Sequence, residues 1–499
     1  MYSLDSQTAG AYAVPSKTLF MKEISIKALI GILNARVIGS GNTIRNTHDA
    51  LRVSTDSRST QPGECFFAIA GPNFDGHNFI ADVFAKGAAC AVVSKDIPVD
   101  KFPGKAILKV SDTTKALGDL AAWYRKDCNF KVIAITGSVG KTTTRQIVYH
   151  VLSLRFKTFQ SLKNFNNFIG LPLSILAAPA DSQILVIELA TSSPGEIEYL
   201  SRIAAPDIAL VTNVHPAHLA GFGSIEKIAE EKLSIAKGLS PKGTLIINAD
   251  CPPLLNAAKR ANLSFKTFSC SATADYLAQN TVIGPLAVSF TIDNTTIELP
   301  LPGRGNVENA LAAWAICSSF GIYARDFAKV VKTINPVSMR TELLQIGSSA
   351  TGFAVGETSL KGGLTVINDC YNANPASMKN ALEILANLAA DRKQRSVFIC
   401  GDMAELGDSE QALHRQLGRQ IAEANVHLLL TVGNLAALAA DAAKLANPAI
   451  VTHKFAAPAE LCNNLHNLIK DSDIILVKGS RVNKLETVVE KLKVLRDLK

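Results

Sequence analysis

The stretch Val132-Ile133-Ala134-Ile135-Thr136-Gly137-Ser138-Val139-Gly140-Lys141-Thr142-Thr143 decides the fold of this 499-residue chain. Its first four residues form a continuous apolar run, which predicts a strand buried within a parallel sheet. A loop containing Gly137 and Gly140 follows, and a helix is predicted to start at Thr143. A strand, a glycine-containing turn and a helix in this order are the context of a phosphate-binding loop.

The chemistry of the loop follows from its residue types. Glycines allow backbone N–H groups to point at phosphate oxygens, and the helix N-terminus adds a partial positive charge. Lys141 is placed to reach the β and γ phosphates, and the Thr142 hydroxyl to bind Mg²⁺. Ile135 stands where the common pattern has a further glycine, so the loop is a shortened variant. The sequence therefore predicts nucleoside triphosphate binding by Thr136, Gly137, Ser138, Val139, Gly140, Lys141, Thr142 and Thr143.

Downstream of this loop, strand patterns alternate with helical ones. Further strands are predicted at residues 184–189, 208–212 and 244–248, and a helix at 225–239. This alternation is typical of an α/β fold with a parallel sheet covered on both faces. Residues 290–299 alternate between apolar and polar about Asp293-Asn294, which predicts an antiparallel hairpin at the sheet edge.

Similar patterns occur on either side of the central unit. Strands at 65–70 and 89–93 indicate a small α/β domain near the N-terminus, with a turn at 71–77 between them. The third unit reads as another doubly wound sheet, with predicted strands at 364–367, 397–400, 428–432 and 474–477. The last three of these run into Gly401, Gly433 and Gly479. We therefore expect a loose tail at 1–22 and three domains, at 23–128, 129–336 and 337–499.

Composition narrows the class of protein. Hydrophobic residues make up 47% of the chain, enough for several cores. Lys+Arg is 51 and Asp+Glu is 43, and this diffuse excess of +8 does not favour a nucleic-acid partner. The nine cysteines are scattered without closely spaced pairs, which predicts free thiols in a reducing compartment. With neither a signal-peptide pattern nor a run of about 20 apolar residues, we expect a cytoplasmic protein without a membrane span.

Three polar residues of the central unit are candidates for chemistry. Glu188 ends a predicted strand, where a carboxylate can hold Mg²⁺ or simply face solvent. His218 follows the next strand, and a lone histidine is more often structural or exposed than a ligand. Lys232 lies in a helix beside Glu230 and Glu231, where a solvated lysine is the simpler interpretation.

Ordered segments from Asp56 to Arg481 resemble the Mur ligase family. The short phosphate loop is one of them, and the two most specific lie in the third unit. The others are an asparagine-rich segment and a histidine segment in the centre, and a closing segment near the C-terminus. The phosphate loop is at 136–142, the two specific segments are residues 369–375 and 401–407, and the three others are residues 164–172, 212–224 and 477–481.

The resemblance implies a three-domain, ATP-dependent amide ligase and assigns roles by matched position. Lys141, Lys232 and His218 would be catalytic, with Lys232 carbamylated. Beyond the loop, ATP would contact Asn309, Arg340 and Asp369. Mg²⁺ would be held by Thr142, Glu188 and His218. Substrates would contact Thr55, Asp56, Ser57, Arg58, Asn164, Asn166, Asn167, Tyr371, Asn372 and Asn374.

The implied reaction joins D-alanyl-D-alanine to UDP-N-acetylmuramoyl-tripeptide through an acyl phosphate. The first domain would hold the UDP-sugar and the last domain the dipeptide, in a monomer that closes during catalysis. Another amino-acid ligase of the same family and a P-loop switch without ligase activity remain as alternatives. A catalytically inactive scaffold is a third, suggested by unusual residues at Gly305, Asn368 and Ala190.

Overall fold

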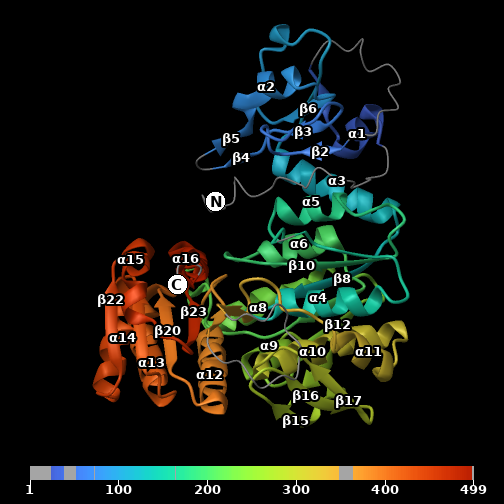
Figure 1. The fold of residues 1–499 in the computed structure, drawn as a ribbon. Coiled ribbons are helices and arrows are strands. Elements are labelled where there is room, and N and C mark those ends of the chain that lie inside the picture. The colour runs from blue at the N-terminus through green and yellow to red at the C-terminus, as the bar shows by residue number, and fades with distance from the viewer. Residues whose placement is uncertain (1–23, 39–51, 72–73, 163, 348–362, 497–499) are drawn as a thin grey trace. The chain divides into compact units, whose positions relative to one another are not determined.

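The computed structural model describes residues 24–38, 52–71, 74–162, 164–347 and 363–496 (Figure 1). The predicted tail at 1–22 lies outside these residues, as do Pro72 and Asn73 of the predicted turn. Two compact units make up the chain. One consists of residues 1–136, 152–210 and 234–245, and the other of residues 137–151, 211–233 and 246–499.

The N-terminal part is built on a five-stranded sheet with the order β1-β7-β6-β3-β2. All of its pairs are parallel except β1 with β7. Phe66, Ile80, Val83 and Ile107 contribute to its core. The elements are α1 (Ile26–Leu33), β1 (Arg36–Val37), β2 (Val53–Ser54), β3 (Cys65–Phe67), β4 (Ala70–Gly71), β5 (Phe74–Asp75), α2 (Ile80–Ala85), β6 (Cys90–Val93), β7 (Ala106–Lys109) and α3 (Thr113–Asp127).

The central part contains the predicted parallel sheet, with seven strands in the order β14-β13-β12-β11-β8-β10-β9. Strand β8 carries the apolar run that precedes the phosphate loop, and it pairs in parallel with β10. The predicted strands are confirmed within a residue or two. The strands are β8 (Lys131–Thr136), β9 (Thr158–Gln160), β10 (Ile184–Glu188), β11 (Ile208–Val211), β12 (Thr244–Asn248), β13 (Lys266–Ser269) and β14 (Tyr276–Leu277).

The two helices predicted in the central part exist, and the structure corrects the start of one and the extent of the other. Helix α4 starts at Lys141 rather than Thr143, because the Thr144 amide already donates to the Gly140 carbonyl. The helix predicted at 225–239 divides into α8 and a 3₁₀ segment, η4 (Ser234–Gly238). The α-helices are α4 (Lys141–Leu152), α5 (Gly170–Leu176), α6 (Glu196–Ala204), α7 (Leu219–Phe222), α8 (Ile225–Leu233), α9 (Pro252–Arg260), α10 (Arg304–Cys317) and α11 (Ala324–Val331).

The predicted hairpin exists, but its predicted place at the edge of the parallel sheet is wrong. Strands β16 (Val288–Ile292) and β17 (Thr295–Leu299) join β15 (Gln279–Ile283) in a separate three-stranded antiparallel sheet. Asp293 and Asn294 both adopt positive φ, as a two-residue hairpin turn requires. The alternating apolar side chains of β16 and β17 are buried, and these strands contact α10 and α11. The apolar–polar alternation in the sequence indicates that one face of the hairpin is buried, but it does not indicate which element packs against that face.

The C-terminal part is a six-stranded sheet in the order β18-β19-β23-β20-β21-β22, parallel except for β18. The four predicted strands are confirmed, and two edge strands were missed. The elements are β18 (Glu342–Ile346), β19 (Leu364–Asn368), α12 (Pro375–Arg392), β20 (Ser396–Gly401), α13 (Glu410–Glu423), β21 (Leu428–Val432), α14 (Asn434–Ala446), β22 (Val451–Phe455), α15 (Pro458–Leu468), β23 (Ile474–Lys478) and α16 (Glu486–Arg496).

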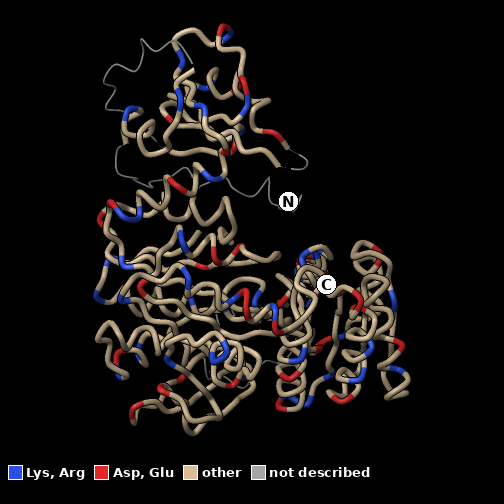
Figure 2. The backbone as a smooth tube through the Cα atoms, turned by 180° about the vertical axis from the view of Figure 1, so that it is seen from behind, with Lys and Arg blue, Asp and Glu red and all other residues tan. Residues whose placement is uncertain are grey.

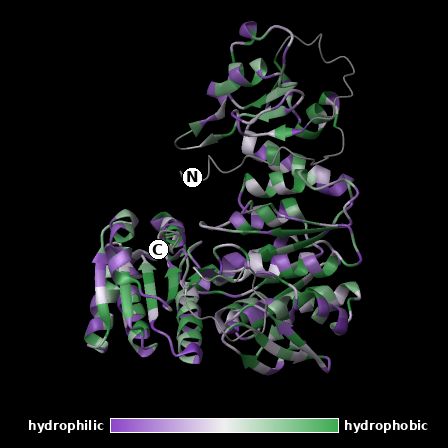
Figure 3. Cartoon of the chain, viewed as in Figure 1, coloured by the Kyte–Doolittle hydropathy of each residue, from purple (hydrophilic) through white to green (hydrophobic). Residues whose placement is uncertain are grey.

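This sheet is covered on both faces, as a doubly wound fold requires. Ile367 and Phe398 belong to the core beneath α12, α13 and α14. Their neighbours Val366 and Val397 belong to the opposite core, beneath α15 and α16. Figure 3 shows the strands of this sheet coloured mainly as hydrophobic.

Surface charge and thiols agree with the expectations from composition. Figure 2 shows blue and red positions interspersed along the chain, without a long stretch of one sign. All nine cysteines are free, and six of them are buried. Among the described residues, none of the helices has the length and apolar character needed to cross a membrane.

Candidate functional site

Two glycines of the phosphate loop are required by the backbone and by close neighbours. Gly137 has φ +145°, and a Cβ there would lie 1.9 Å from Oγ1 of Thr212. Gly140 has φ +86°, and a Cβ there would lie 2.1 Å from Oδ1 of Asn309. Both positions therefore exclude any residue with a side chain.

The segment after β11 fixes the shape of this loop. The Asn213 carbonyl accepts from the Ser138 amide over 3.0 Å, and its side-chain Oδ1 accepts from the Val139 amide over 3.0 Å. Thr212 Oγ1 donates to the Val139 carbonyl over 2.6 Å, and the His215 amide donates to Ser138 Oγ over 2.9 Å. Loop geometry is thus set before any ligand arrives. Sequence reasoning did not assign this bracing role to Thr212 or Asn213.

Lys141 and Thr142 occupy the first turn of α4. The Lys141 ammonium donates to the Gly137 carbonyl over 2.7 Å, which folds its side chain back along the loop. Asn309 on α10 packs against the same loop, and its side-chain amide donates to Asn306 Oδ1 over 3.1 Å. The structure thus brings Asn309 to the phosphate loop, and its contact with the nucleotide stays a prediction.

Lys232 is buried, which corrects its interpretation as a solvated lysine. Burial, together with a smaller effect of the positive charge of Lys141, lowers the pKa of its amine to about 7, and Glu231 opposes this shift. A lysine in this condition carries a substantial neutral fraction near pH 7. The neutral amine is the nucleophilic form, so Lys232 is chemically distinct from the surface lysines of the chain.

Two of the three predicted metal ligands, Glu188 and His218, have different settings. Glu188 is the last residue of β10, is buried, and pairs in register with Ile135 of β8. His218 precedes α7 in a left-handed conformation, with φ +58°, and its Nδ1 forms a hydrogen bond with the Glu405 carboxylate. Among the residues that the structure describes, no three His, Cys, Asp or Glu side chains form a metal cluster.

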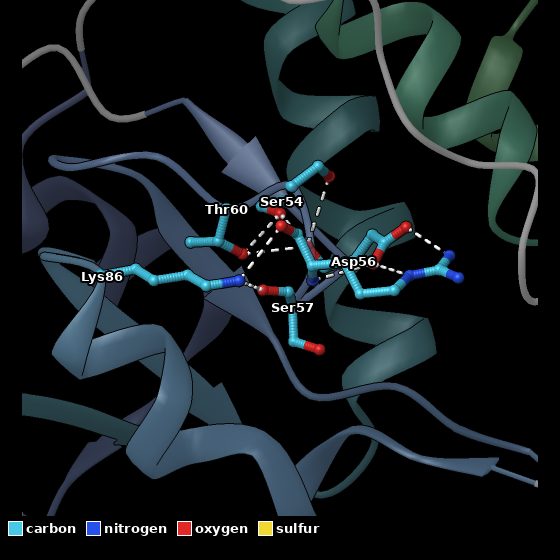
Figure 4. A network of polar contacts seen from close by, with 7 residues as sticks. Ser54, Asp56, Ser57, Thr60 and Lys86 are labelled. Carbon is cyan, nitrogen blue, oxygen red and sulfur yellow. Dashed lines mark hydrogen bonds and ion pairs between the residues drawn. The ribbon is translucent and has the colours of Figure 1, made fainter.

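The predicted UDP-sugar segment is a compact polar turn in the N-terminal part (Figure 4). Arg58 forms a two-pronged pair with Asp56, with distances of 2.8 and 2.7 Å. This guanidinium holds the pKa of the Asp56 carboxyl below its usual value. The Lys86 ammonium donates to the carbonyls of Ser57 and Arg58, at 2.6 and 3.0 Å. The turn is therefore held from within, while the Arg58 side chain remains 66% exposed.

In the asparagine-rich segment, some of the polar groups form hydrogen bonds within the protein. Asn167 Oδ1 accepts from the Gly170 amide over 2.9 Å, at the start of α5. The Asn166 carbonyl accepts from the Ala190 amide over 2.9 Å. Asn164 is exposed, and Asn166 and Asn167 are half-buried. Roles of these three in substrate contact stay predictions.

At the carboxyl edge of the C-terminal sheet, several predicted residues converge. Lys478 Nζ donates to Asp369 Oδ2 over 2.6 Å and to the Asn372 carbonyl over 3.0 Å. Arg340 stacks on Tyr371, with 4.2 Å from its guanidinium carbon to the ring centroid. Sequence reasoning placed Asp369 here but gave no role to Lys478. The available signal was that Lys478 directly follows a predicted strand.

Asn374 caps the N-terminus of a helix, a role that the sequence did not reveal. Its side chain accepts from the Ser377 amide over 2.9 Å, and the Ser377 hydroxyl contacts the Asn374 backbone in return, which makes a capping box at the start of α12. Contact between Asn374 and a substrate stays a prediction.

Comparison with known proteins agrees with this geometry. Residues 52–125 match "Mur ligase family, catalytic domain", residues 135–317 match "Mur ligase middle domain" and residues 354–481 match "Mur ligase, glutamate ligase domain". The chain is 36% identical to UDP-N-acetylmuramoyl-tripeptide–D-alanyl-D-alanine ligase of Bacillus subtilis, over 88% of this chain and 92% of that protein. It is 33% identical to the Escherichia coli enzyme of the same name, over 95% and 99%.

Solved structures give the same result. MurF from Acinetobacter baumannii superposes with a TM-score of 0.83 at 30% identity, covering 95% of this chain and 100% of that one. MurF ligase from Thermotoga maritima, solved in complex with ADP, superposes with a TM-score of 0.76 at 25% identity, covering 90% and 98%. The chain belongs to the Mur ligase family.

Proposed function

We propose that this protein is an ATP-dependent ligase that joins D-alanyl-D-alanine to UDP-N-acetylmuramoyl-tripeptide. The observation that carries this proposal is the match to enzymes of that name over 88–95% of the chain. The preformed phosphate loop supplies the ATP-dependent part of the reaction. We place the reaction in the cytoplasm, supported by nine free cysteines, and we propose that the protein acts as a monomer.

The chemistry begins with activation of a carboxylate. An oxygen of the tripeptide carboxylate attacks the γ-phosphorus of ATP, and the bond to ADP breaks. The product is an acyl phosphate, whose leaving group is phosphate rather than oxide. Lys141 and the backbone N–H groups of the loop stabilise the charge that spreads over the transferring phosphoryl group.

The second step forms the amide. The dipeptide amine attacks the acyl carbon, phosphate leaves, and the nitrogen loses a proton. In this proposal, Asp56 and Arg58 contact the UDP-sugar, Asp369 and Arg340 contact ATP, and Tyr371 and Asn372 contact the dipeptide. Holding the reacting groups together contributes the proximity that a three-substrate reaction needs.

Magnesium fits the donors that the chain offers. Thr142 and Glu188 provide the hydroxyl and carboxylate oxygens that Mg²⁺ prefers, and Mg²⁺ commonly takes its other ligands from substrate phosphates. In our proposal Thr142, Glu188 and His218 hold the metal, which would neutralise phosphate charge during transfer.

Lys232 completes the proposed catalytic group. Its neutral amine attacks CO₂, a C–N bond forms, and loss of one proton leaves a carbamate anion in place of an ammonium. This converts a cation beside Lys141 into an anion, which removes the repulsion that lowers the lysine pKa. A carbamylated Lys232 would bring a negative charge to the nucleotide site.

One assay tests the proposal. The full chain is given UDP-N-acetylmuramoyl-tripeptide, Mg²⁺ and ATP, and phosphate release is measured with and without D-alanyl-D-alanine, with the product mass recorded. We expect release that requires the dipeptide. The Lys141→Ala variant should lose turnover, while Lys227→Ala, an exposed lysine on α8, should retain it.

The alternatives give different results in this assay. Phosphate release that ignores the dipeptide would identify a P-loop switch and overturn the ligase proposal. Amide formation with glutamate or a diamino acid in place of the dipeptide would identify another Mur-type ligase. No turnover with any substrate would favour an inactive scaffold.

A further inference from the structure

The loop that follows β20, residues 402–407, is held by a side chain at each of its first three positions. Asp402 Oδ1 accepts from the Ala436 amide over 2.6 Å in the first turn of α14. Gly433 lies against that carboxylate, and a Cβ there would be 2.4 Å from Asp402 Oδ2. The start of the loop is thereby fixed to the next helix.

The next two residues are held through their amides. The Met403 amide donates to Nε2 of His414 over 3.0 Å, and His414 is fully buried on α13. Its Nδ1 lies 2.6 Å from the Glu410 carbonyl, so Nδ1 carries the proton and Nε2 is the acceptor. The Ala404 amide donates to Ser480 Oγ over 2.7 Å, and the Ser480 amide donates to the Asp402 carbonyl over 3.0 Å.

Glu405 comes directly after this fixed stretch and is presented outward. Its φ is +64°, a conformation that is costly for a residue with a side chain. The side chain is 48% exposed, and its carboxylate forms a hydrogen bond with His218 Nδ1. The fixed loop therefore holds a carboxylate against a residue from a distant part of the sequence.

Two backbone contacts accompany this hydrogen bond. The Ala220 amide donates to the Glu405 carbonyl over 3.3 Å. Gly407 lies against the Ala220 backbone, where a Cβ would be 3.2 Å from the Ala220 Cα. The segment 218–220 thus contacts both the Glu405 side chain and the backbone of loop 402–407.

We infer that Glu405 is a positioning residue for His218, and that it orients the imidazole as a metal ligand. This inference rests on the proposed function, in which His218 holds Mg²⁺. A carboxylate at Nδ1 keeps the proton on that nitrogen and leaves the Nε2 lone pair for a cation. Ligating histidines usually have such a partner, which fixes the ring and increases its basicity.

The requirement for a positioning residue follows from the chemistry of His218. Mg²⁺ prefers oxygen ligands, so an imidazole that is free to rotate or to change tautomer would be a poor ligand. The contact of Glu405 with Nδ1 limits both the rotation of the ring and the exchange of its tautomers.

The test measures metal binding directly in the full chain. Mn²⁺ binding is followed by electron paramagnetic resonance in the presence of a non-hydrolysable ATP analogue. Removal of an outer partner of a metal ligand typically weakens binding about 10–100-fold. We expect at least a tenfold loss in Glu405→Ala and a smaller loss in Glu405→Gln, which can still accept from Nδ1. Asp408→Ala, an exposed acid next to the same loop, should bind as the wild type does.

His218→Ala separates this inference from the function on which it rests. If His218→Ala binds Mn²⁺ like the wild type, the metal role of His218 fails, and the Glu405 inference fails with it. If His218→Ala weakens binding and Glu405→Ala does not, only the Glu405 inference is overturned. Support requires that the double variant bind no more weakly than His218→Ala alone. Histidine ¹⁵N shifts supply a second readout, since Glu405→Ala should alter the Nδ1–H tautomer of His218.

Discussion

Lys478 and Asp369, at the ends of adjacent parallel strands, form a buried ion pair with 2.6 Å between Nζ and Oδ2. The Lys478 side chain is 2% exposed, and its ammonium also binds the Asn372 carbonyl. Asp369 in turn accepts from the Thr341 amide over 3.1 Å. One lysine therefore ties together the turn after β19 and the approach to β18.

Replacing Lys478 with Met should destabilise the C-terminal sheet. The change leaves the Asp369 carboxylate buried without its cation, which typically costs about 3–5 kcal/mol. Hydrogen exchange of peptides from β19 and β23 measures the local free energy of opening. Lys493→Met is the matched control, because its pair with Glu490 is on the surface and should contribute less than about 1 kcal/mol. Equal losses in the two variants would contradict the prediction.

Gly140→Ala should disable the phosphate loop. A methyl group at this position collides with Asn309 and also faces the left-handed backbone penalty. We expect ADP affinity, measured by calorimetry, to fall by at least about tenfold. Gly321→Ala separates the two causes: its φ is +73°, and a Cβ there meets no heavy atom within 4 Å. That control should lose about 1–2 kcal/mol of stability and keep its affinity for ADP. Unchanged ADP affinity in Gly140→Ala would show that the loop tolerates a side chain.

Stability should fall between pH 5 and pH 8 because of Glu308. Burial, together with a smaller effect of the negative charge of Asp250, raises the pKa of its carboxyl to about 7, and Arg304 opposes this shift. A carboxyl whose pKa is higher in the folded state than in the unfolded state favours folding when it is protonated. This contribution is fully present below pH 4.5, about the unfolded pKa, and is lost as the pH rises through about 7, the folded pKa.

Glu308→Gln cannot ionise, so it should be as stable as the wild type at pH 5 and more stable at pH 8, by about 1–3 kcal/mol. Fluorescence of the buried Trp314, on the same helix, reports unfolding in urea. Glu423→Gln, an exposed acid on α13, should behave alike at both pH values. A pH-independent gain in Glu308→Gln would place the cause outside its ionisation.

Sequence patterns predicted the central strands well because burial on both faces leaves a continuous apolar run, as in β8 and β10. Edge strand β22 was missed for the opposite reason, since Thr452, His453 and Lys454 lie in a largely exposed strand. The hairpin β16–β17 was predicted from its alternation and its Asp293-Asn294 turn. Its partner sheet was not, because alternation does not specify what covers the apolar face.

The functional features that could be predicted are those whose residues lie close together in the sequence. The phosphate loop is contiguous, so glycine, lysine and threonine at fixed spacing reveal it. The bracing of that loop by Asn213, and the pairing of Lys478 with Asp369, join residues 74 and 109 positions apart. Burial of Lys232 was hidden by its acidic neighbours, since Glu230 is exposed while Glu231 and Lys232 face inward.

The depressed pKa of Lys232 predicts a reaction with CO₂ that depends on pH. Its amine has a pKa of about 7, so the neutral form increases as pH rises through 7. At a fixed concentration of dissolved CO₂, the ¹³C carbamate signal should therefore rise from pH 6 to pH 8. Lys232→Arg cannot form this carbamate and should lose the signal and most turnover, whereas Lys227→Arg should keep both. Removal of CO₂ should lower the rate, and bicarbonate should restore it. Full activity of Lys232→Arg in CO₂-free buffer would show that Lys232 contributes only packing.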